Sequence, residues 1–95
     1  MSATDLGKPR RIAEEVMESR LSDGYVLLQT ETGQYYGLDT LGSELWDAMK
    51  RGRTPADFVA AWEGELDVSR EHFAEDIARL IEDLENCRLI EVAAA

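Results

Sequence analysis

The stretch from Asp23 to Trp46 limits the fold most, because it is typical of a β-hairpin that runs directly into a helix. Ser22-Asp23-Gly24 predicts a tight reversal before the first strand, and Thr30 to Gly33 fits a type I turn that closes with a left-handed glycine. The second strand, GQYYGL, has neither a charged residue nor a proline. An exposed strand edge normally carries one or the other to prevent unwanted pairing, so we interpret this edge as one kept open for a partner.

A three-residue hairpin loop predicts three facing pairs: Thr30 with Gln34, Leu28 with Tyr36, and Val26 with Leu38. Side chains alternate along a strand, so every second residue lies on the same face. The predicted core face carries the more apolar set, Val26, Leu28, Tyr36 and Leu38. The other face carries Tyr25, Leu27, Gln29, Tyr35 and Gly37. Gly37 packs nothing inside the strand, which indicates either a local bend or the close approach of another backbone.

The chain has 95 residues, which is the size of one small domain. We expect a flexible arm over residues 1–11, one domain over residues 12–92 and a disordered tail over residues 93–95. No apolar run approaches the roughly 20 residues that span a bilayer, and the N-terminus lacks the apolar region of a secretory signal. The sequence therefore predicts a cytoplasmic protein that does not contact a membrane.

The net charge of −10 disfavours nucleic acid as a partner, because phosphates are held mainly by lysine and arginine. The positive charges gather in the N-terminal arm and in the trio Lys50, Arg51 and Arg53. We interpret this trio as cations that complement the dipole at a helix C-terminus, with a phosphate patch as the alternative.

The residues from Glu14 to Leu21 alternate well enough for a further strand, which would pair with Tyr25 to Thr30. Charged side chains would guard this opposite edge of the sheet: Glu14, Glu15, Glu18 and Arg20. The alternative for this region is an N-terminal helix over Ile12 to Ser19.

The remaining chain predicts three helices. The first begins at Asp39 or Thr40 and ends at Gly52, and the second begins after Thr54. The third begins at Ser69 and buries a stripe made of Phe73, Ile77, Leu80, Ile81 and Leu84. The predicted fold class is therefore α+β, a three-stranded antiparallel sheet followed by three helices, which matches a winged helix-turn-helix arrangement.

No set of residues for catalysis is visible in the sequence, so we expect a protein that is not an enzyme. His72 is interpreted as a partly exposed helix residue and Cys87 as a small buried one, and together they supply neither a disulfide nor a metal site. We expect no cofactor. Ser43 in LGSEL is similar to the serine of carrier proteins that receives a phosphopantetheine arm, but Gly42 stands where those proteins have an aspartate.

The tracts GQYYGLDTLGSELWDAM, GRTPADFVAAW, LDVSREHFAEDIARLIEDL and LIEV, in this order, resemble the PqqD-like family. The resemblance covers roughly Val16 to Val92. It implies a winged helix-turn-helix domain without catalysis, also called a RiPP recognition element. Such domains bind the leader of a ribosomally made precursor peptide as an added strand beside the third strand, in a groove whose other wall is the third helix, and present the core peptide to modifying enzymes.

The hairpin TETGQYYGLD is similar to the stand-alone members from lasso-peptide clusters, whereas the pyrroloquinoline quinone member typically has a proline-glutamate-glycine turn there. Arg88 stands where the family usually has a glycine, which leaves the end of the third helix open. The resemblance implies three partners, namely the precursor leader, a leader-cleaving protease and an ATP-dependent cyclase or other modifying enzyme. The alternatives are a leader-binding chaperone of another ribosomal peptide pathway, including that of pyrroloquinoline quinone, and an acidic winged-helix regulator.

The predicted peptide-binding residues are Gln34, Tyr35, Tyr36, Gly37 and Leu38 on the third strand, and Asp76, Leu80, Asp83 and Leu84 on the third helix. The helix flank with Asp76, Leu80, Asp83 and Cys87 offers apolar pockets beside carboxylates. The other flank carries Ala74, Ala78 and Glu85, and the sequence leaves open which of them lines the groove.

Backbone hydrogen bonds alternate in direction along a hairpin strand, and this alternation predicts which backbone groups of the third strand remain free. With a loop of either two or three residues, the amides of Gln34, Tyr36 and Leu38 point toward the second strand. Those of Tyr35 and Gly37 then point outward, where a leader strand can bond to them.

Overall fold

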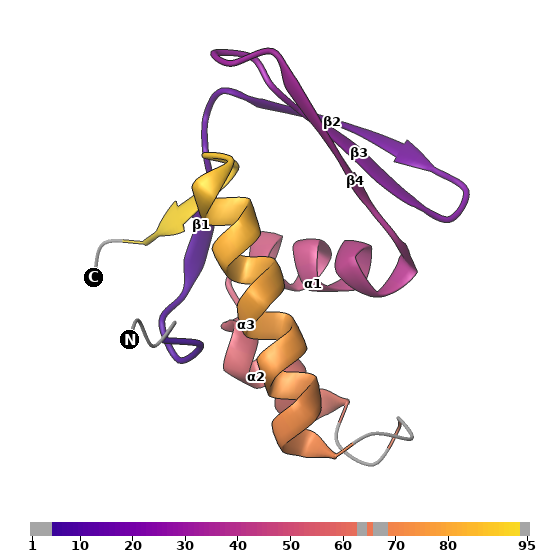
Figure 1. Cartoon of the computed structure of the whole chain (residues 1–95), viewed down its shortest axis with the longest axis vertical. Coiled ribbons are helices and arrows are strands. Elements are labelled where there is room, and N and C mark those ends of the chain that lie inside the picture. The colour runs from indigo at the N-terminus through magenta and orange to yellow at the C-terminus, as the bar shows by residue number, and fades with distance from the viewer. Residues whose placement is uncertain (1–4, 63–64, 66–68, 94–95) are drawn as a thin grey trace.

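The structure is a computed structural model that describes residues 5–62, 65 and 69–93. Within these residues the elements follow in the order β1 (Arg10–Ile12), β2 (Val16–Leu21), β3 (Gly24–Gln29), β4 (Gln34–Leu38), α1 (Thr40–Lys50), α2 (Pro55–Ala61), α3 (Arg70–Asn86) and β5 (Ile90–Val92). The strands β2, β3 and β4 form an antiparallel sheet, and β1 pairs with β5 in a second, two-stranded one. Figure 1 shows the larger sheet across one end of the molecule, with the helices beneath it. The predicted three-stranded sheet followed by three helices is confirmed, and the alternative helix over Ile12 to Ser19 is wrong.

The pairing of β3 with β4 differs from the predicted register by one residue. Gln29 faces Gln34, Leu27 faces Tyr36 and Tyr25 faces Leu38. The loop has four residues instead of three, because the amide of Gly33 donates to the carbonyl of Gln29 at 2.8 Å. Gly33 has the predicted left-handed conformation, with a φ of 77°.

A slip of one residue moves every side chain of a strand to the opposite face. The core face of β3 is therefore formed by Tyr25, Leu27 and Gln29, and the prediction of Val26 and Leu28 as core residues is wrong. On β4 the predicted core face is correct, with Tyr36 half-buried and Leu38 buried.

Gln29 is 1% exposed, which is unusual for an amide side chain. Its Nε2 donates to the carbonyl of Arg88 at 2.7 Å, and its Oε1 accepts from the amide of Glu31 at 2.8 Å. Because a buried polar group must find partners, these bonds explain how Gln29 occupies a core position. They also join the β3–β4 loop to the end of α3.

All three helices begin at the predicted capping residues. The Asp39 carboxylate accepts from the amide of Gly42, and the Ser69 hydroxyl accepts from that of His72. At Thr54 a complete capping box forms with Asp57. Each cap satisfies amides that a helix start leaves without partners.

The residue that ends α3 has a left-handed backbone conformation, which glycine adopts most easily. Arg88 has a φ of 62°. Its amide donates to the carbonyl of Glu85, and the amide of Leu89 donates to that of Leu84, which is the hydrogen-bond pattern of a Schellman motif. The helix therefore ends as the family pattern requires, although the residue is an arginine.

The hydrophobic core lies between the inner face of the sheet and the helices. The fully buried side chains include Leu27, Leu45, Trp46, Ile77 and Ile81. The indole N–H of Trp46 donates to the Glu18 carboxylate of β2 at 3.1 Å, so its polar atom is satisfied where the core meets the sheet.

The N-terminal arm is shorter than expected, because Arg10 and Arg11 belong to β1. The Arg10 side chain is 2% exposed and pairs with Glu85 of α3 at 2.9 Å. The partner strand β5 lies about 80 residues further along the chain, so local pattern did not indicate the pairing. Residues 1–4 of the expected arm and residues 94–95 of the expected tail lie outside the described part of the chain.

Candidate functional site

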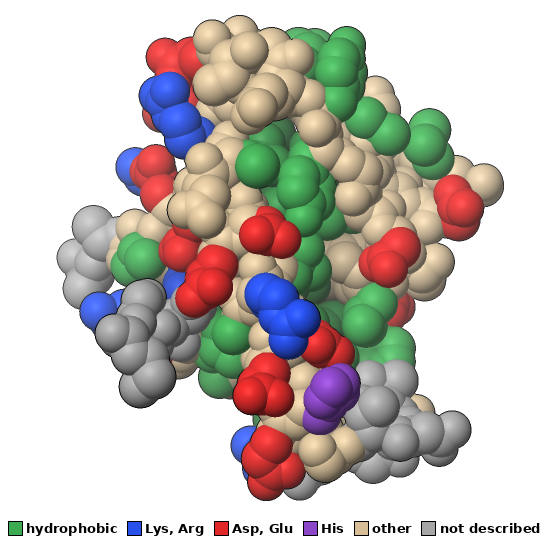
Figure 2. All heavy atoms as spheres, viewed as in Figure 1, with side chains coloured by type: hydrophobic (Ala, Val, Ile, Leu, Met, Phe, Trp, Pro, Cys, Tyr) green, Lys and Arg blue, Asp and Glu red, His purple; other side chains and the backbone are tan. Residues whose placement is uncertain are grey.

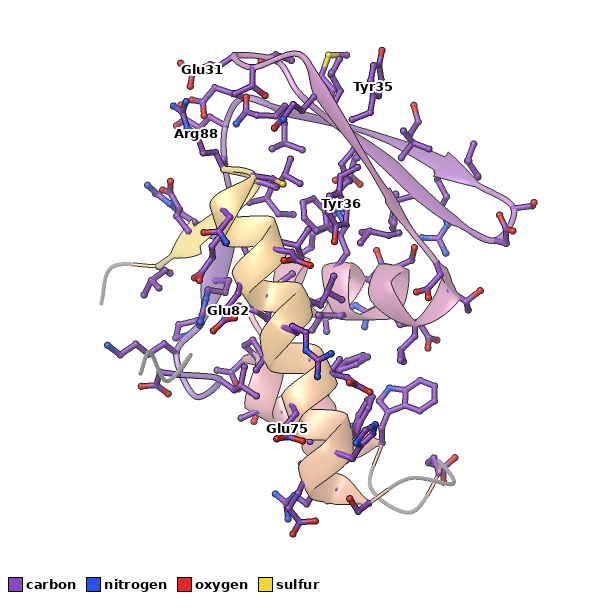
Figure 3. The ribbon with its side chains drawn as sticks, in the orientation of Figure 1. Glu31, Tyr35, Tyr36, Glu75, Glu82 and Arg88 are labelled. Atoms are coloured by element: carbon purple, nitrogen blue, oxygen red, sulfur yellow. The ribbon has the colours of Figure 1, made fainter. Side chains whose placement is uncertain are left out.

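The edge formed by β4 is open on its outer side. In the order β2-β3-β4 this strand is terminal, and no other described strand pairs with it. Tyr35 is 71% exposed and projects away from the helices (Figure 3), whereas Tyr36 lies on the helical side. A Cβ added at Gly37 would meet no atom within 4 Å. The chain itself therefore leaves the space beside Gly37 empty.

The register determines which backbone groups of β4 point outward. Directly after β3, the amide of Thr30 donates to the carbonyl of Glu15, the residue before β2, at 2.8 Å. Backbone groups alternate in direction, so Gln29, Leu27 and Tyr25 bond toward β4, where they face Gln34, Tyr36 and Leu38. The amides and carbonyls of Tyr35 and Gly37 are then directed away from the sheet. The predicted register gives the same outward groups on β4, because the one-residue shift changes only which residues of β3 face β4.

The opposite edge, β2, carries charged side chains that bond to α1. Glu18 pairs with Lys50 at 2.6 Å, and Arg20 pairs with Asp47 at 3.1 Å. The hydrogen bond to Glu18 raises the pKa of Lys50, and the hydrogen bond to Asp47 raises that of Arg20. The contrast between a charged edge and an uncharged edge within one sheet is therefore present in the structure.

Two hollows lie along the inner side of β4. The first, of about 260 Å³, is called here the Leu80 hollow and is lined by Tyr36, Gly37, Leu38, Asp39, Gly42 and Leu80. The second, of about 180 Å³, is called the Cys87 hollow and is lined by Gln29, Gln34, Tyr35, Tyr36, Cys87 and Leu89. Tyr36 lines both, so the two hollows are neighbouring parts of one groove between β4 and α3. Figure 2 shows hydrophobic side chains exposed there, with acidic side chains along α3.

The surroundings of Tyr36 indicate which flank of α3 faces the groove. Burial raises the pKa of the Tyr36 hydroxyl, and the charges of Asp83 and Cys87 raise it further. Leu80 lines the neighbouring hollow. Glu85, on the other flank, pairs instead with Arg10 of β1. The groove wall is thus the flank that carries Leu80, Asp83 and Cys87.

The structure does not bring all the predicted helix residues to the groove. Leu84 is 1% exposed and belongs to the core. Asp76 lies near His72 and Arg79 on its own helix, at 3.6 Å from each, and lines neither hollow. Both were predicted from helical spacing alone, which does not give the rotation of α3 relative to β4.

Five residues that line the hollows were not among the predicted binding residues, namely Asp39, Gly42, Gln29, Cys87 and Leu89. Asp39 was interpreted only as a possible first residue of a helix, and Gly42 only in the comparison with carrier proteins. Gly42 has a packing role, since an added Cβ would lie 3.2 Å from both the Asp39 carboxylate and the Leu38 side chain. The turn between β4 and α1 therefore forms one end of the groove.

The described residues contain no arrangement that suggests catalysis or metal binding. No group of three or more His, Cys, Asp or Glu could hold a metal ion within residues 5–62, 65 and 69–93. Ser43 is 5% exposed and its hydroxyl donates to the carbonyl of Leu38 at 3.4 Å, so it cannot receive a prosthetic arm and the carrier alternative is wrong. His72 is exposed, as predicted. No helix in this part of the chain is long and apolar enough to cross a bilayer.

Comparison with known proteins identifies one protein family and two solved structures. The profile of the family described as coenzyme PQQ synthesis protein D (PqqD) matches residues 24–90. The structure of TbiB1 in complex with the TbiA(beta) leader peptide is 33% identical, with a TM-score of 0.78, and the match covers 90% of this chain and 99% of that chain. Lasso peptide synthetase B1 complexed with the leader peptide is 26% identical, also with a TM-score of 0.78, over 86% of this chain and 96% of that chain. No curated protein matches significantly.

Proposed function

Because this chain belongs to the PqqD family, we propose that it is a leader-binding RiPP recognition element that holds the leader of a ribosomally made precursor peptide as an added strand on β4. The protein acts by binding and has no catalysis of its own. The observation that carries the proposal is the open, uncharged edge of β4 beside the groove.

The outward backbone groups of Tyr35 and Gly37 offer two donors and two acceptors to a leader strand. Each hydrogen bond contributes about 0.5 to 1.5 kcal/mol net, so four contribute about 2 to 6 kcal/mol. A dissociation constant of 1 μM corresponds to about 8 kcal/mol. Backbone bonding alone is therefore too weak for tight binding, and leader side chains that enter the two hollows supply much of the rest.

The carboxylates beside the groove favour an amphipathic or basic leader. Asp39 lines the Leu80 hollow, and the charge of Asp83 raises the pKa of the nearby Tyr36 hydroxyl. On this proposal the apolar leader residues enter the hollows while a lysine or arginine lies near these carboxylates. The strongly acidic chain also attracts a basic leader from a distance.

We further propose that the pathway makes a lasso peptide and that the partners are a leader-cleaving protease and an ATP-dependent cyclase. The similarity to lasso peptide synthetase B1 supports the lasso pathway, as does the absence of a proline from the β3–β4 loop. The protein would act in the cytoplasm, where the precursor is translated. Synthesis of pyrroloquinoline quinone is the second candidate, because the family profile takes its description from that pathway.

Isothermal titration of the purified protein with the leader encoded beside it tests the proposal. We expect saturable binding with a 1:1 stoichiometry, and no hydrolysis or ligation of the precursor by this protein alone. If neither the leader nor the full precursor binds, the proposed function is wrong. A neighbouring gene for an asparagine-synthetase-like cyclase would favour the lasso pathway over the quinone pathway.

A further inference from the structure

A third hollow, of about 250 Å³, lies between β2, the C-terminal half of α1, and α2. It is called here the arginine hollow, because its lining includes Arg20, Arg51 and Arg53. It shares no lining residue with the groove along β4. Since β2 and β4 are the two opposite edges of the sheet, a leader on β4 leaves this hollow accessible.

The arginines gather here although the chain has a net charge of −10. Arg20 is held in place by the Tyr25 hydroxyl at 2.8 Å and the Asp47 carboxylate at 3.1 Å. Arg51 and Arg53 are exposed, and no carboxylate in the described part of the chain forms an ion pair with either of them. The predicted role of these two residues, to complement the dipole of α1, therefore leaves their guanidinium groups available to a ligand.

The lining also determines the charge that the hollow can accept. Glu44 and Asp47 lie among the three arginines, so three positive charges and two negative charges leave one net positive charge. A guanidinium binds a carboxylate through two parallel hydrogen bonds. A single carboxylate matches the net charge, whereas a phosphate dianion would exceed it and would be repelled by both acidic side chains.

The apolar part of the lining is aromatic. Phe58 is buried and Trp62 is half-buried, and their ring centroids are 6.0 Å apart at an angle of 44°. Within the described chain, no group accepts a hydrogen bond from the Trp62 indole N–H. The hollow thus places an aromatic surface next to two arginines without ion-pair partners.

We propose that the arginine hollow binds a carboxylate borne on an aromatic or apolar group, presented by the modifying enzyme that receives the leader-bound precursor. This inference rests on the proposed function, because a domain that only binds must transfer the precursor to a catalyst. The hollow gives the enzyme a contact that does not compete with the leader. One protein can therefore hold the precursor and the enzyme together.

The chemistry of the hollow is tested first with small probes followed by NMR. Phenylacetate should shift the Trp62 indole signal saturably, and phenylacetamide and inorganic phosphate should bind at least fivefold more weakly. The Trp46 indole, which is buried and bonded to Glu18, should not respond. Arg51→Gln combined with Arg53→Gln should abolish the shift, whereas the control Arg79→Gln on α3 should not. Equal binding of the amide or of phosphate, or an unchanged double variant, would overturn the assignment.

The partner is tested with the protease and the cyclase of the same pathway. The Arg51→Gln/Arg53→Gln variant should bind at least one of these enzymes tenfold more weakly than the wild type, while its affinity for the leader stays within twofold. If the variant and the wild type bind both enzymes equally, or if the wild type binds neither, the inference is wrong. If the wild type does not bind the leader, the proposed function fails instead, so the two failures can be distinguished.

Discussion

Arg88 has the backbone conformation that glycine adopts most easily, and two contacts compensate for this. Its side chain pairs with Glu31 at 2.7 Å, and its carbonyl accepts from the buried Gln29. The ion pair is exposed at both ends, so it contributes at most about 1 kcal/mol. A side chain in the left-handed region costs about 1 kcal/mol relative to glycine. The two effects nearly cancel, which explains how an arginine is tolerated.

The pair of variants Arg88→Gly and Arg88→Ala separates these two effects. Both lose the pairing with Glu31, but only the glycine also relieves the backbone. We expect Arg88→Gly to be more stable than Arg88→Ala by about 1 kcal/mol in urea unfolding. A glycine variant that is less stable than the alanine variant would show that the conformation at this position carries no strain.

Asp47 is a second residue whose environment gives a measurable effect. Burial acts to raise the pKa of its carboxyl, but hydrogen bonds from Tyr25 at 2.6 Å and Arg20 at 3.1 Å outweigh it and lower the pKa below its ordinary value. A carboxyl with a lowered folded-state pKa stabilises the fold above its unfolded-state pKa. This stabilisation is lost as the pH falls through the folded-state pKa.

The variant Asp47→Asn should therefore be less stable than the wild type by about 1 to 2 kcal/mol at pH 7. The difference should shrink below about pH 4, the ordinary pKa of aspartate. Urea unfolding of both proteins from pH 7 to pH 2.5 measures this. A difference that is independent of pH would mean that the charge of Asp47 does not contribute to stability.

At the level of elements, caps and apolar stripes predicted the helices correctly, because those signals are local. The β3–β4 register was not predictable in this way. A three-residue and a four-residue loop both fit the turn residues of Thr30 to Gly33. The burial of Gln29 determines the register, because its side-chain amide bonds to Glu31 and to Arg88. Arg88 lies far along the chain, so local pattern does not reveal this contact. The outward amides of β4 were predicted correctly, because a three-residue loop and a four-residue loop leave the same amides of β4 pointing outward.

The variant Gly37→Pro tests the role of β4 directly. It removes one outward donor but no bond to β3, and proline is tolerated on edge strands. We expect at least a tenfold loss of leader affinity by calorimetry, with an unchanged circular dichroism spectrum. Gly37→Ala is the matched control, because an added Cβ meets nothing within 4 Å, and its affinity should stay within threefold. Equal affinities of the two variants would exclude bonding at this amide.

On α3, Leu80 and Leu84 are matched in chemistry but differ in position. Leu84→Ala removes a fully buried side chain and should lower the free energy of unfolding by about 2 to 4 kcal/mol. Leu80→Ala, at the half-buried groove wall, should lower it by less than about 1.5 kcal/mol but weaken leader binding about fivefold to tenfold. If Leu80→Ala leaves the leader affinity unchanged, the Leu80 hollow does not contact the leader.

At the level of the whole molecule, the features missed by sequence reasoning are those that join distant segments. The pairing of β1 with β5 brings together the two ends of the domain. The groove likewise depends on the rotation of α3 against β4, which leaves Leu80 at the groove while Leu84 is buried, and on the turn into α1, which contributes Asp39 and Gly42. The two opposite edges of the sheet therefore differ: β4 is the proposed binding edge for the leader, and β2 borders the arginine hollow.

The central claim is that the leader adds a strand to β4, and amide hydrogen exchange measured residue by residue by NMR tests it most directly. A ligand slows exchange at the amides it covers by about the ratio of its free concentration to its dissociation constant. With leader at about 100 times that constant, we expect exchange at Tyr35 and Gly37 to slow far more than at Tyr36, which is already bonded to β3. Slowing confined to β2, or equal at all three residues, would contradict the account.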